Sequence, residues 1–133
     1  MFQKLRNTLK NQKGLTLIEL LAVIVILGII AAIAIPSIGG IIKKSENDAK
    51  VAEGIQIISA AKMYVTSSNP GAGDLTKTQL EQFLDNVKDT DYTVTLAVTD
   101  GKYTYSLKGH DSVALVDSDP KDSVATEKEL LDY

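Results

Sequence analysis

A long apolar block follows a basic stretch near the start of the chain. From Leu20 to Ile42, 23 consecutive residues carry no formal charge, and most of them are Leu, Ile, Val or Ala. A membrane-spanning helix needs about 20 such residues at about 1.5 Å of rise each, whereas a core helix of a soluble protein shows a polar face. The block therefore predicts either a membrane helix or the apolar part of a cleaved signal sequence.

Apolar residues keep a helical spacing beyond this block, until helix breakers appear at residues 67–71. We therefore predict one long helix from about Leu15 to Ser67, which would be roughly 80 Å long at about 1.5 Å per residue. Pro36 and the Gly39-Gly40 pair lower helix propensity and predict a kink at Pro36. Residues 43–67 form the amphipathic half of the helix, with an apolar stripe of Val51, Ile55, Ile58, Ala61 and Val65.

Residues 68–133 predict a small head that packs on the amphipathic half of the helix. Thr76 and Gln79 fit a capping box, which predicts a short helix from Lys77 to Val87. At the other end of the head, Thr126–Leu131 either forms a short terminal helix or stays loose.

A β-hairpin is the strongest signal within the head. The segments Tyr92–Thr99 and Lys102–Lys108 flank Asp100-Gly101, a dipeptide that favours a type I′ turn. A third strand is expected at Val113–Val116, which predicts an α+β fold with a three-stranded antiparallel sheet covering the long helix. The two-residue turn pairs Val94 with Leu107, Leu96 with Tyr105 and Val98 with Tyr103 on one apolar face.

Charge is distributed unevenly along the 133 residues, whose net charge is −3. The first 14 residues hold four bases and no acid, so the remaining 119 residues hold 10 bases against 17 acids and carry −7. The positive-inside bias places the N-terminus in the cytoplasm and the head outside the membrane. An acidic head is a poor binder of phosphate backbones, so we expect no strong direct nucleic-acid binding. The absence of cysteine excludes disulfides and thiol catalysis.

Glu19 lies at the start of the apolar block and distinguishes three explanations of the N-terminus. A secretory signal cut near Ala32-Ile33-Ala34 would have an unusually long apolar run, and a plain signal anchor gives Glu19 no purpose. A charged carboxylate deep in a bilayer costs about 2.5–3.5 kcal/mol on insertion scales, so such a residue is a functional candidate by default. The third explanation is that Glu19 has a function within the apolar layer. Such a function requires a partner cation in the same layer.

The segment Lys13–Leu21 resembles the class III signal peptide of type IV pilins and type II secretion pseudopilins. The resemblance implies that a prepilin peptidase cuts between Gly14 and Leu15 on the cytoplasmic side, and that the new amine of Leu15 is N-methylated. Glu19 matches the acidic residue of the family, and Pro36 matches the proline that often kinks the anchor helix. The family usually has Phe where this chain has Leu15, a departure that bears on the methylation.

The resemblance also implies a domain order and a structural function. Residues 1–14 would be a cleaved basic leader, residues 15–42 a membrane anchor and filament core, and residues 43–67 the amphipathic half of the helix below the head. The chain would be a major subunit stored in the cell (inner) membrane and polymerised into a pilus or pseudopilus on the cell surface, for adhesion, motility, competence or secretion. Its partners would be other copies, the prepilin peptidase, a platform protein, an assembly ATPase and membrane lipid. In the filament, Glu19 would pair with the amine of Leu15 in a neighbouring copy.

The remaining candidates for chemistry are weak. Asp117, Asp119 and Asp122 lie in an acidic loop that could bind calcium, although their spacing is not that of an EF-hand. His110 stands alone in a predicted turn and is expected at the surface. We find no nucleophile motif or phosphate-binding loop and expect neither enzymatic activity nor a cofactor. The alternative from another class is a signal-anchored or secreted extracellular binding module.

Overall fold

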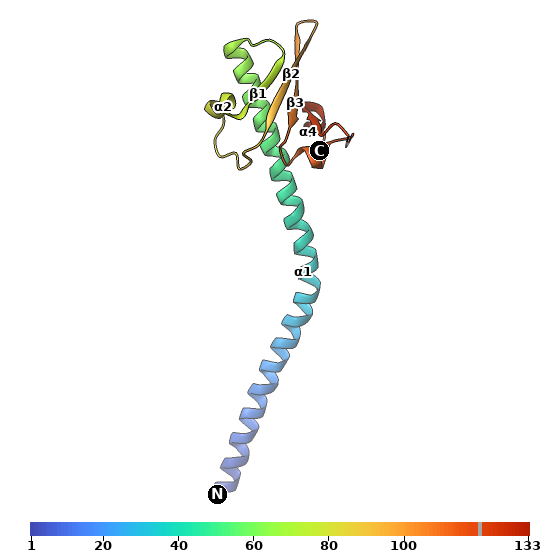
Figure 1. The fold of residues 1–133 in the computed structure, drawn as a ribbon. Helices are drawn as coiled ribbons and strands as arrows, with labels where there is room; N and C mark the ends of the chain where they lie inside the picture. The colour runs from blue at the N-terminus through green and yellow to red at the C-terminus, as the bar shows by residue number, and fades with distance from the viewer. Residues whose placement is uncertain (120) are drawn as a thin grey trace. The chain divides into compact units, whose positions relative to one another are not determined.

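The computed structural model describes residues 1–119 and 121–133 (Figure 1). The chain divides into two compact units, Met1–Lys43 and Lys44–Tyr133. Helix α1, Phe2–Ser68, supplies the first unit and the first helix of the second unit. The second unit continues with β1 (Gly73–Thr76), α2 (Lys77–Leu80), the 3₁₀ turn η1 (Glu81–Phe83), β2 (Thr93–Thr99), β3 (Lys102–Lys108), α3 (Val113–Val116), β4 (Val124–Thr126) and α4 (Glu127–Leu131).

The predicted long helix is confirmed, but it begins earlier than expected. Helix α1 begins at Phe2 rather than near Leu15, and it ends at Ser68, one residue after the expected end. The first 14 residues contain no proline and only one glycine, and their Leu, Lys, Arg and Gln residues favour helix, so nothing ends it there. Pro36 lies inside α1. Because proline has no N–H, the carbonyl of Ala32 lacks its usual helical donor, and the kink stays a prediction.

The head contains a four-stranded antiparallel sheet, so the α+β class is confirmed but the predicted strand count is wrong. The strand order is β1-β2-β3-β4, and each strand pairs with the next one along the chain. Asp100 and Gly101 have φ angles of 53° and 75°, as a type I′ turn requires. The hairpin has the predicted register, with Val94 opposite Leu107, Leu96 opposite Tyr105 and Val98 opposite Tyr103.

The third strand predicted at Val113–Val116 is wrong. These residues form α3, a single helical turn in which the Asp117 N–H donates to the Val113 carbonyl at 2.9 Å. The Val113 N–H donates to the His110 carbonyl at 3.0 Å, so the preceding turn already bends the chain into a helical path. Strand β4 takes the position beside β3 instead. The local turn that begins at His110 therefore overrides the strand preference of the valines.

The helix predicted from Lys77 to Val87 is shorter in the structure. Its capping box is confirmed, and the Thr76 N–H donates to Gln79 Oε1 at 2.9 Å. Helix α2 has a single turn, η1 follows, and Leu84 is already extended with φ −126° and ψ 130°. The capping box therefore fixes where the helix begins but not where it ends.

The core of the head lies between the sheet and the amphipathic half of α1. Four of the five residues in the predicted stripe are buried, and Ile55 is half-buried against them. Helix α4 settles the alternatives for the end of the chain in favour of a helix, with Thr126 and Glu129 as its capping box. The other buried members of the core are Ile57, Leu75, Leu80, Tyr92, Val94, Leu96, Leu107, Val113, Ala125 and Leu130.

Gly54 lies where α1 and the rest of the head are in close contact. A Cβ atom at this position would lie 2.5 Å from Ser112 Oγ and 3.2 Å from Leu130 Cδ2. Ser112 is fully buried, so its hydroxyl has no open space into which it could retreat. Packing therefore requires glycine at this point of the helix.

We predict that Gly54→Ala lowers the free energy of unfolding of the head by up to about 2 kcal/mol, because overpacking costs about 1–3 kcal/mol and the gain in helix propensity offsets about 1. Gly71→Ala is the matched control, since a Cβ atom there meets nothing within 4 Å. Urea denaturation of the full chain in detergent, followed by circular dichroism, measures the difference. Equal stability of the two variants would contradict this packing.

Candidate functional site

The predicted cleavage bond between Gly14 and Leu15 lies in an exposed stretch of α1. The Leu15 side chain is 61% exposed, and a Cβ atom at Gly14 would meet nothing within 4 Å. Packing within the chain therefore does not require glycine at position 14. Cleavage and N-methylation at this bond stay predictions.

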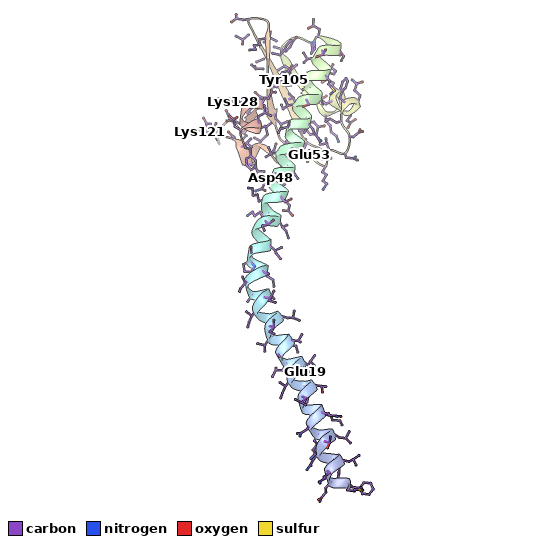
Figure 2. All side chains as sticks on the ribbon, turned by 180° about the vertical axis from the view of Figure 1, so that it is seen from behind. Glu19, Asp48, Glu53, Tyr105, Lys121 and Lys128 are labelled. Carbon is purple, nitrogen blue, oxygen red and sulfur yellow. The ribbon has the colours of Figure 1, made fainter. Side chains whose placement is uncertain are left out.

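Glu19 projects from α1 one helical turn after Leu15 (Figure 2). Residues four apart on a helix lie on the same face, so a free amine at Leu15 would share a face with this carboxylate. Within residues 1–119 and 121–133, no cation forms an ion pair with Glu19. The chain by itself thus places Glu19 among apolar side chains without neutralising it.

Helix α1 is long and apolar enough to cross a membrane. The most apolar stretch of this helix contains no buried residue. Ile24, Leu27 and Ile33 are between 58% and 72% exposed. The core helix of a soluble protein would hide most of this surface, and contiguous exposed apolar patches of this size mark interaction surfaces. The first unit therefore needs lipid or other helices around it.

The predicted surface position of His110 is wrong. This residue is only 3% exposed, its Nδ1 accepts the Ser112 N–H at 3.1 Å, and its Nε2 lies 3.6 Å from Glu53 Oε2. Gly109 has φ 77°, and a Cβ atom there would lie 2.4 Å from the Asp91 carbonyl oxygen. Only glycine lets this turn come close enough to bury the histidine. The glycine before the lone histidine was the signal available in the sequence.

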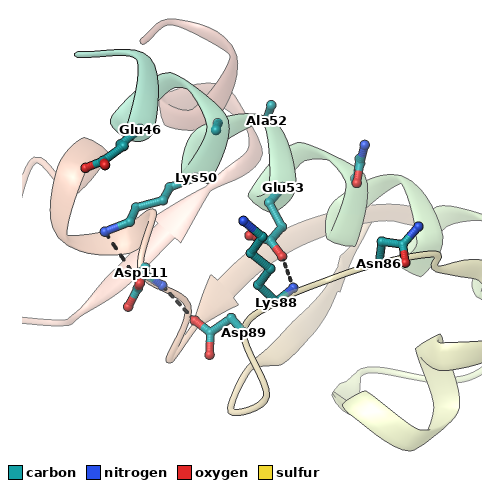
Figure 3. Close-up of a pocket in the computed structure, with 10 residues that line it drawn as sticks. Glu46, Lys50, Ala52, Glu53, Asn86, Lys88, Asp89 and Asp111 are labelled. Carbon is teal, nitrogen blue, oxygen red and sulfur yellow. Dashed lines mark hydrogen bonds and ion pairs between the residues drawn. The ribbon is translucent and has the colours of Figure 1, made fainter. Parts of the chain in front are cut away.

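A groove between α1 and two loops of the head contains several charged groups (Figure 3). Glu53 accepts the Lys88 N–H, Asp89 Oδ2 accepts the Asp111 N–H at 3.0 Å, and Lys50 Nζ lies 3.6 Å from Asp111 Oδ2. Desolvation raises the pKa of Asp89, but hydrogen bonds from backbone N–H groups outweigh it and hold that pKa below its usual 3.8. These charges hold the loops against α1.

The acidic loop that could bind calcium is folded by its own carboxylates. Asp117 Oδ1 accepts the Asp119 N–H at 2.8 Å, and Asp122 Oδ1 accepts the Val124 N–H at 3.3 Å. Pro120 of this loop lies outside the described residues. In the rest of the chain, no three His, Asp or Glu side chains come together in a group that could hold a metal ion. Calcium binding stays a prediction.

Glu129 connects this loop to the C-terminal helix. It accepts a hydrogen bond from the Ser118 hydroxyl, and its Oε2 accepts the Thr126 N–H and the Thr126 hydroxyl, both at 2.8 Å. The bonds from Ser118 and then Thr126 stabilise the ionised form and lower the pKa of Glu129 from the usual 4.5 to about 2.

We predict that this carboxylate makes the head sensitive to acid. Because the pKa of Glu129 is lower in the folded state, its contribution to stability is fully present above pH 4.5 and is lost as the pH falls toward about 2. Glu129→Gln should be less stable than the parent at neutral pH and should lose less stability between those two pH values. Denaturant unfolding at a series of pH values tests this, with Asp132→Asn as an exposed control. Parallel curves for Glu129→Gln and the parent would contradict it.

A family model matches the N-terminal segment, and several known proteins are similar to part of the chain. The family model described as the prokaryotic N-terminal methylation motif matches residues 9–35. Type II secretion system core protein G of Pectobacterium carotovorum subsp. carotovorum is 36% identical over 59 residues, which cover 44% of this chain and 38% of that protein. The type IV major fimbrial protein FimA of Dichelobacter nodosus is 29% identical over 109 residues, which cover 82% of this chain and 54% of that protein.

The similarity does not extend over whole relatives. The core protein G of Aeromonas hydrophila is 35% identical over 60 residues, which cover 45% of this chain and 42% of that protein. The chain thus spans about half or less of the length of the curated relatives it matches. No solved structure matches it significantly. The chain therefore carries the N-terminal methylation motif on a long first helix below an α+β head, and it is similar over part of its length to a secretion core protein and to a major fimbrial protein.

Proposed function

We propose that the chain is a structural subunit of a type IV pilus or type II secretion pseudopilus. The observation that carries this proposal is the methylation motif over residues 9–35, which includes Gly14, Leu15 and Glu19 on one exposed, apolar helix. The relatives named as a secretion core protein and a major fimbrial protein support it. The subunit is anchored by α1, with its basic N-terminus in the cytoplasm and its head outside.

Proteolytic processing supplies the positive charge that the apolar anchor lacks. A prepilin peptidase cuts between Gly14 and Leu15, which removes a leader of charge +4 and creates a free amine at Leu15. N-methylation of that amine leaves it basic, so it keeps its positive charge. The cut thus places a cation one turn away from Glu19, in the same apolar layer.

The charge of Glu19 makes assembly specific. Apolar side chains gain little by exchanging lipid for neighbouring helices, because lipid tails are as apolar as they are. A carboxylate left alone in that layer costs about 2.5–3.5 kcal/mol, whereas an amine about 4 Å away returns about 4 kcal/mol at an effective dielectric constant of 20. Pairing Glu19 with the Leu15 amine of a neighbouring copy therefore favours one axial register over the others.

The head and the assembly machinery complete the proposal. The subunit needs a platform protein in the membrane and an assembly ATPase that drives polymerisation, and the filament carries the head on its outside. The residues after the leader carry a net charge of −7, so the head contributes no strong direct binding to nucleic acid. The subunit acts mechanically, without catalysis of its own.

We predict that Glu19→Val leaves membrane insertion and processing intact but abolishes filament formation, because the amine of a neighbour then has no anion to meet. Asp48→Val is the matched control, because it removes an exposed acid of α1 outside the apolar block. Immunoblotting of cell-bound and sheared fractions measures both processing and assembly.

The control should assemble at the level of the parent. Normal filament yield from Glu19→Val would contradict the assembly role of this carboxylate. Absence of sheared filaments from the parent itself, under conditions in which it is expressed and processed, would contradict the proposed function.

A further inference from the structure

Helix α1 runs without interruption through the bond that is to be cut. It begins at Phe2, so Gly14 and Leu15 lie more than three turns inside it. A carbonyl inside a helix accepts the N–H four residues later, which for Gly14 is the N–H of Ile18. A peptidase that attacks the Gly14 carbonyl must therefore open at least one turn of this helix first.

Gly14 lowers the cost of opening the helix, and the structure gives it no other role within the chain. A Cβ atom at this position would meet nothing within 4 Å, so packing does not demand glycine. Glycine inside a helix disfavours the helical state relative to alanine. The cut therefore falls at a point where the helix is intrinsically weak.

Thr16 adds a second feature on the other side of the bond. Its hydroxyl donates to the Lys13 carbonyl at 3.0 Å and lies 3.2 Å from the Gln12 carbonyl. In the helix, these two carbonyls also accept the N–H groups of Leu17 and Thr16 itself. The hydroxyl thus bridges the Gly14–Leu15 bond, with its donor after the bond and its acceptors before it.

Such a hydroxyl can replace a backbone donor when the helix opens. Carbonyls freed near a membrane must find another partner, and Ser or Thr side chains supply one in membrane helices. Hydrogen bonding of Ser or Thr to a carbonyl one turn earlier also weakens and bends the helix slightly. Both effects favour the opened turn over the closed one.

We propose that Thr16 is a positioning residue for cleavage, whose hydroxyl lowers the cost of opening α1 around the Gly14–Leu15 bond. The proposal rests on the proposed function, because it takes the prepilin peptidase as the enzyme that binds the opened turn and cuts it. In the reaction itself, water adds across the peptide bond, so that Gly14 leaves with a carboxylate and Leu15 with an amine. Thr16 contributes to neither bond and acts only on the conformation that the peptidase receives.

The chain offers a matched control for this hydroxyl. Thr8 makes the same kind of bond within the leader, where its hydroxyl donates to the Lys4 carbonyl at 2.8 Å. Thr→Val at either position removes the hydroxyl and keeps the β-branched shape. Thr16→Ser keeps the hydroxyl and serves as the conservative rescue.

The first experiment measures cleavage of the full chain, in vesicles with prepilin peptidase, for the parent and the three variants. Thr16→Val should lower kcat/KM by about threefold to tenfold, the effect of losing one neutral hydrogen bond. Thr16→Ser should stay within about twofold of the parent, and Thr8→Val should match it. Equal cleavage of Thr16→Val and the parent would overturn the proposal.

The second experiment measures opening without any peptidase, by amide hydrogen exchange of the full chain in detergent micelles. The amides of Leu17 and Ile18 should exchange more slowly in Thr16→Val than in the parent, because the closed helix is then relatively more favourable. If cleavage falls while exchange is unchanged, the hydroxyl contacts the peptidase directly and the proposal is wrong. If the peptidase does not cut the parent at Gly14, the proposed function fails, and the exchange rates still decide whether Thr16 opens the helix.

Discussion

A single carboxylate at the start of an apolar helix is the constraint on which the rest of the molecule depends. Glu19 lies next to 23 uncharged residues, on a helix whose most apolar stretch contains no buried residue in the isolated chain. Lipid can cover the apolar surface but cannot neutralise the charge. Leu15 lies one turn before Glu19, so cleavage in front of it would supply a cation at the right depth. The position of the predicted cut and the position of Glu19 would then act together, because the cut would supply the cation that neutralises the carboxylate.

The head must fold on the amphipathic half of α1, without any disulfide to stabilise it. Its core uses one face of α1, and Gly54 allows the turn with Ser112 to approach that face closely. The buried His110 next to Glu53 lies in that same turn, and the Lys88 N–H that Glu53 accepts holds one further loop against the helix. The head thus obtains from α1 the apolar surface that a unit of its size could not supply alone.

The sequence predicted those features that two local signals support together. The hairpin register was correct because the Asp100-Gly101 turn and the alternation of apolar residues agree. Strands β1 and β4 were missed because each is short, has only one buried residue and is paired along its length with a neighbouring strand. The valines of α3 suggested a strand, but the turn at His110 decided their conformation. At the N-terminus, the chemistry of a carboxylate in an apolar block singles out Glu19, and the resemblance to the signal peptide of pilins singles out Gly14 and Leu15. The bond from Thr16 to Lys13 required the helical geometry.

The most direct measurement of the central claim is the mass of the N-terminal peptide in polymerised material. Filaments sheared from cells, dissolved and digested, should yield a terminal peptide that begins at Leu15 and carries one additional methyl group. A terminal peptide that still contains the basic residues before Gly14, or one that begins after Ala34, would contradict the account. In the first case no cation would have been freed beside Glu19, and in the second Glu19 would have been removed.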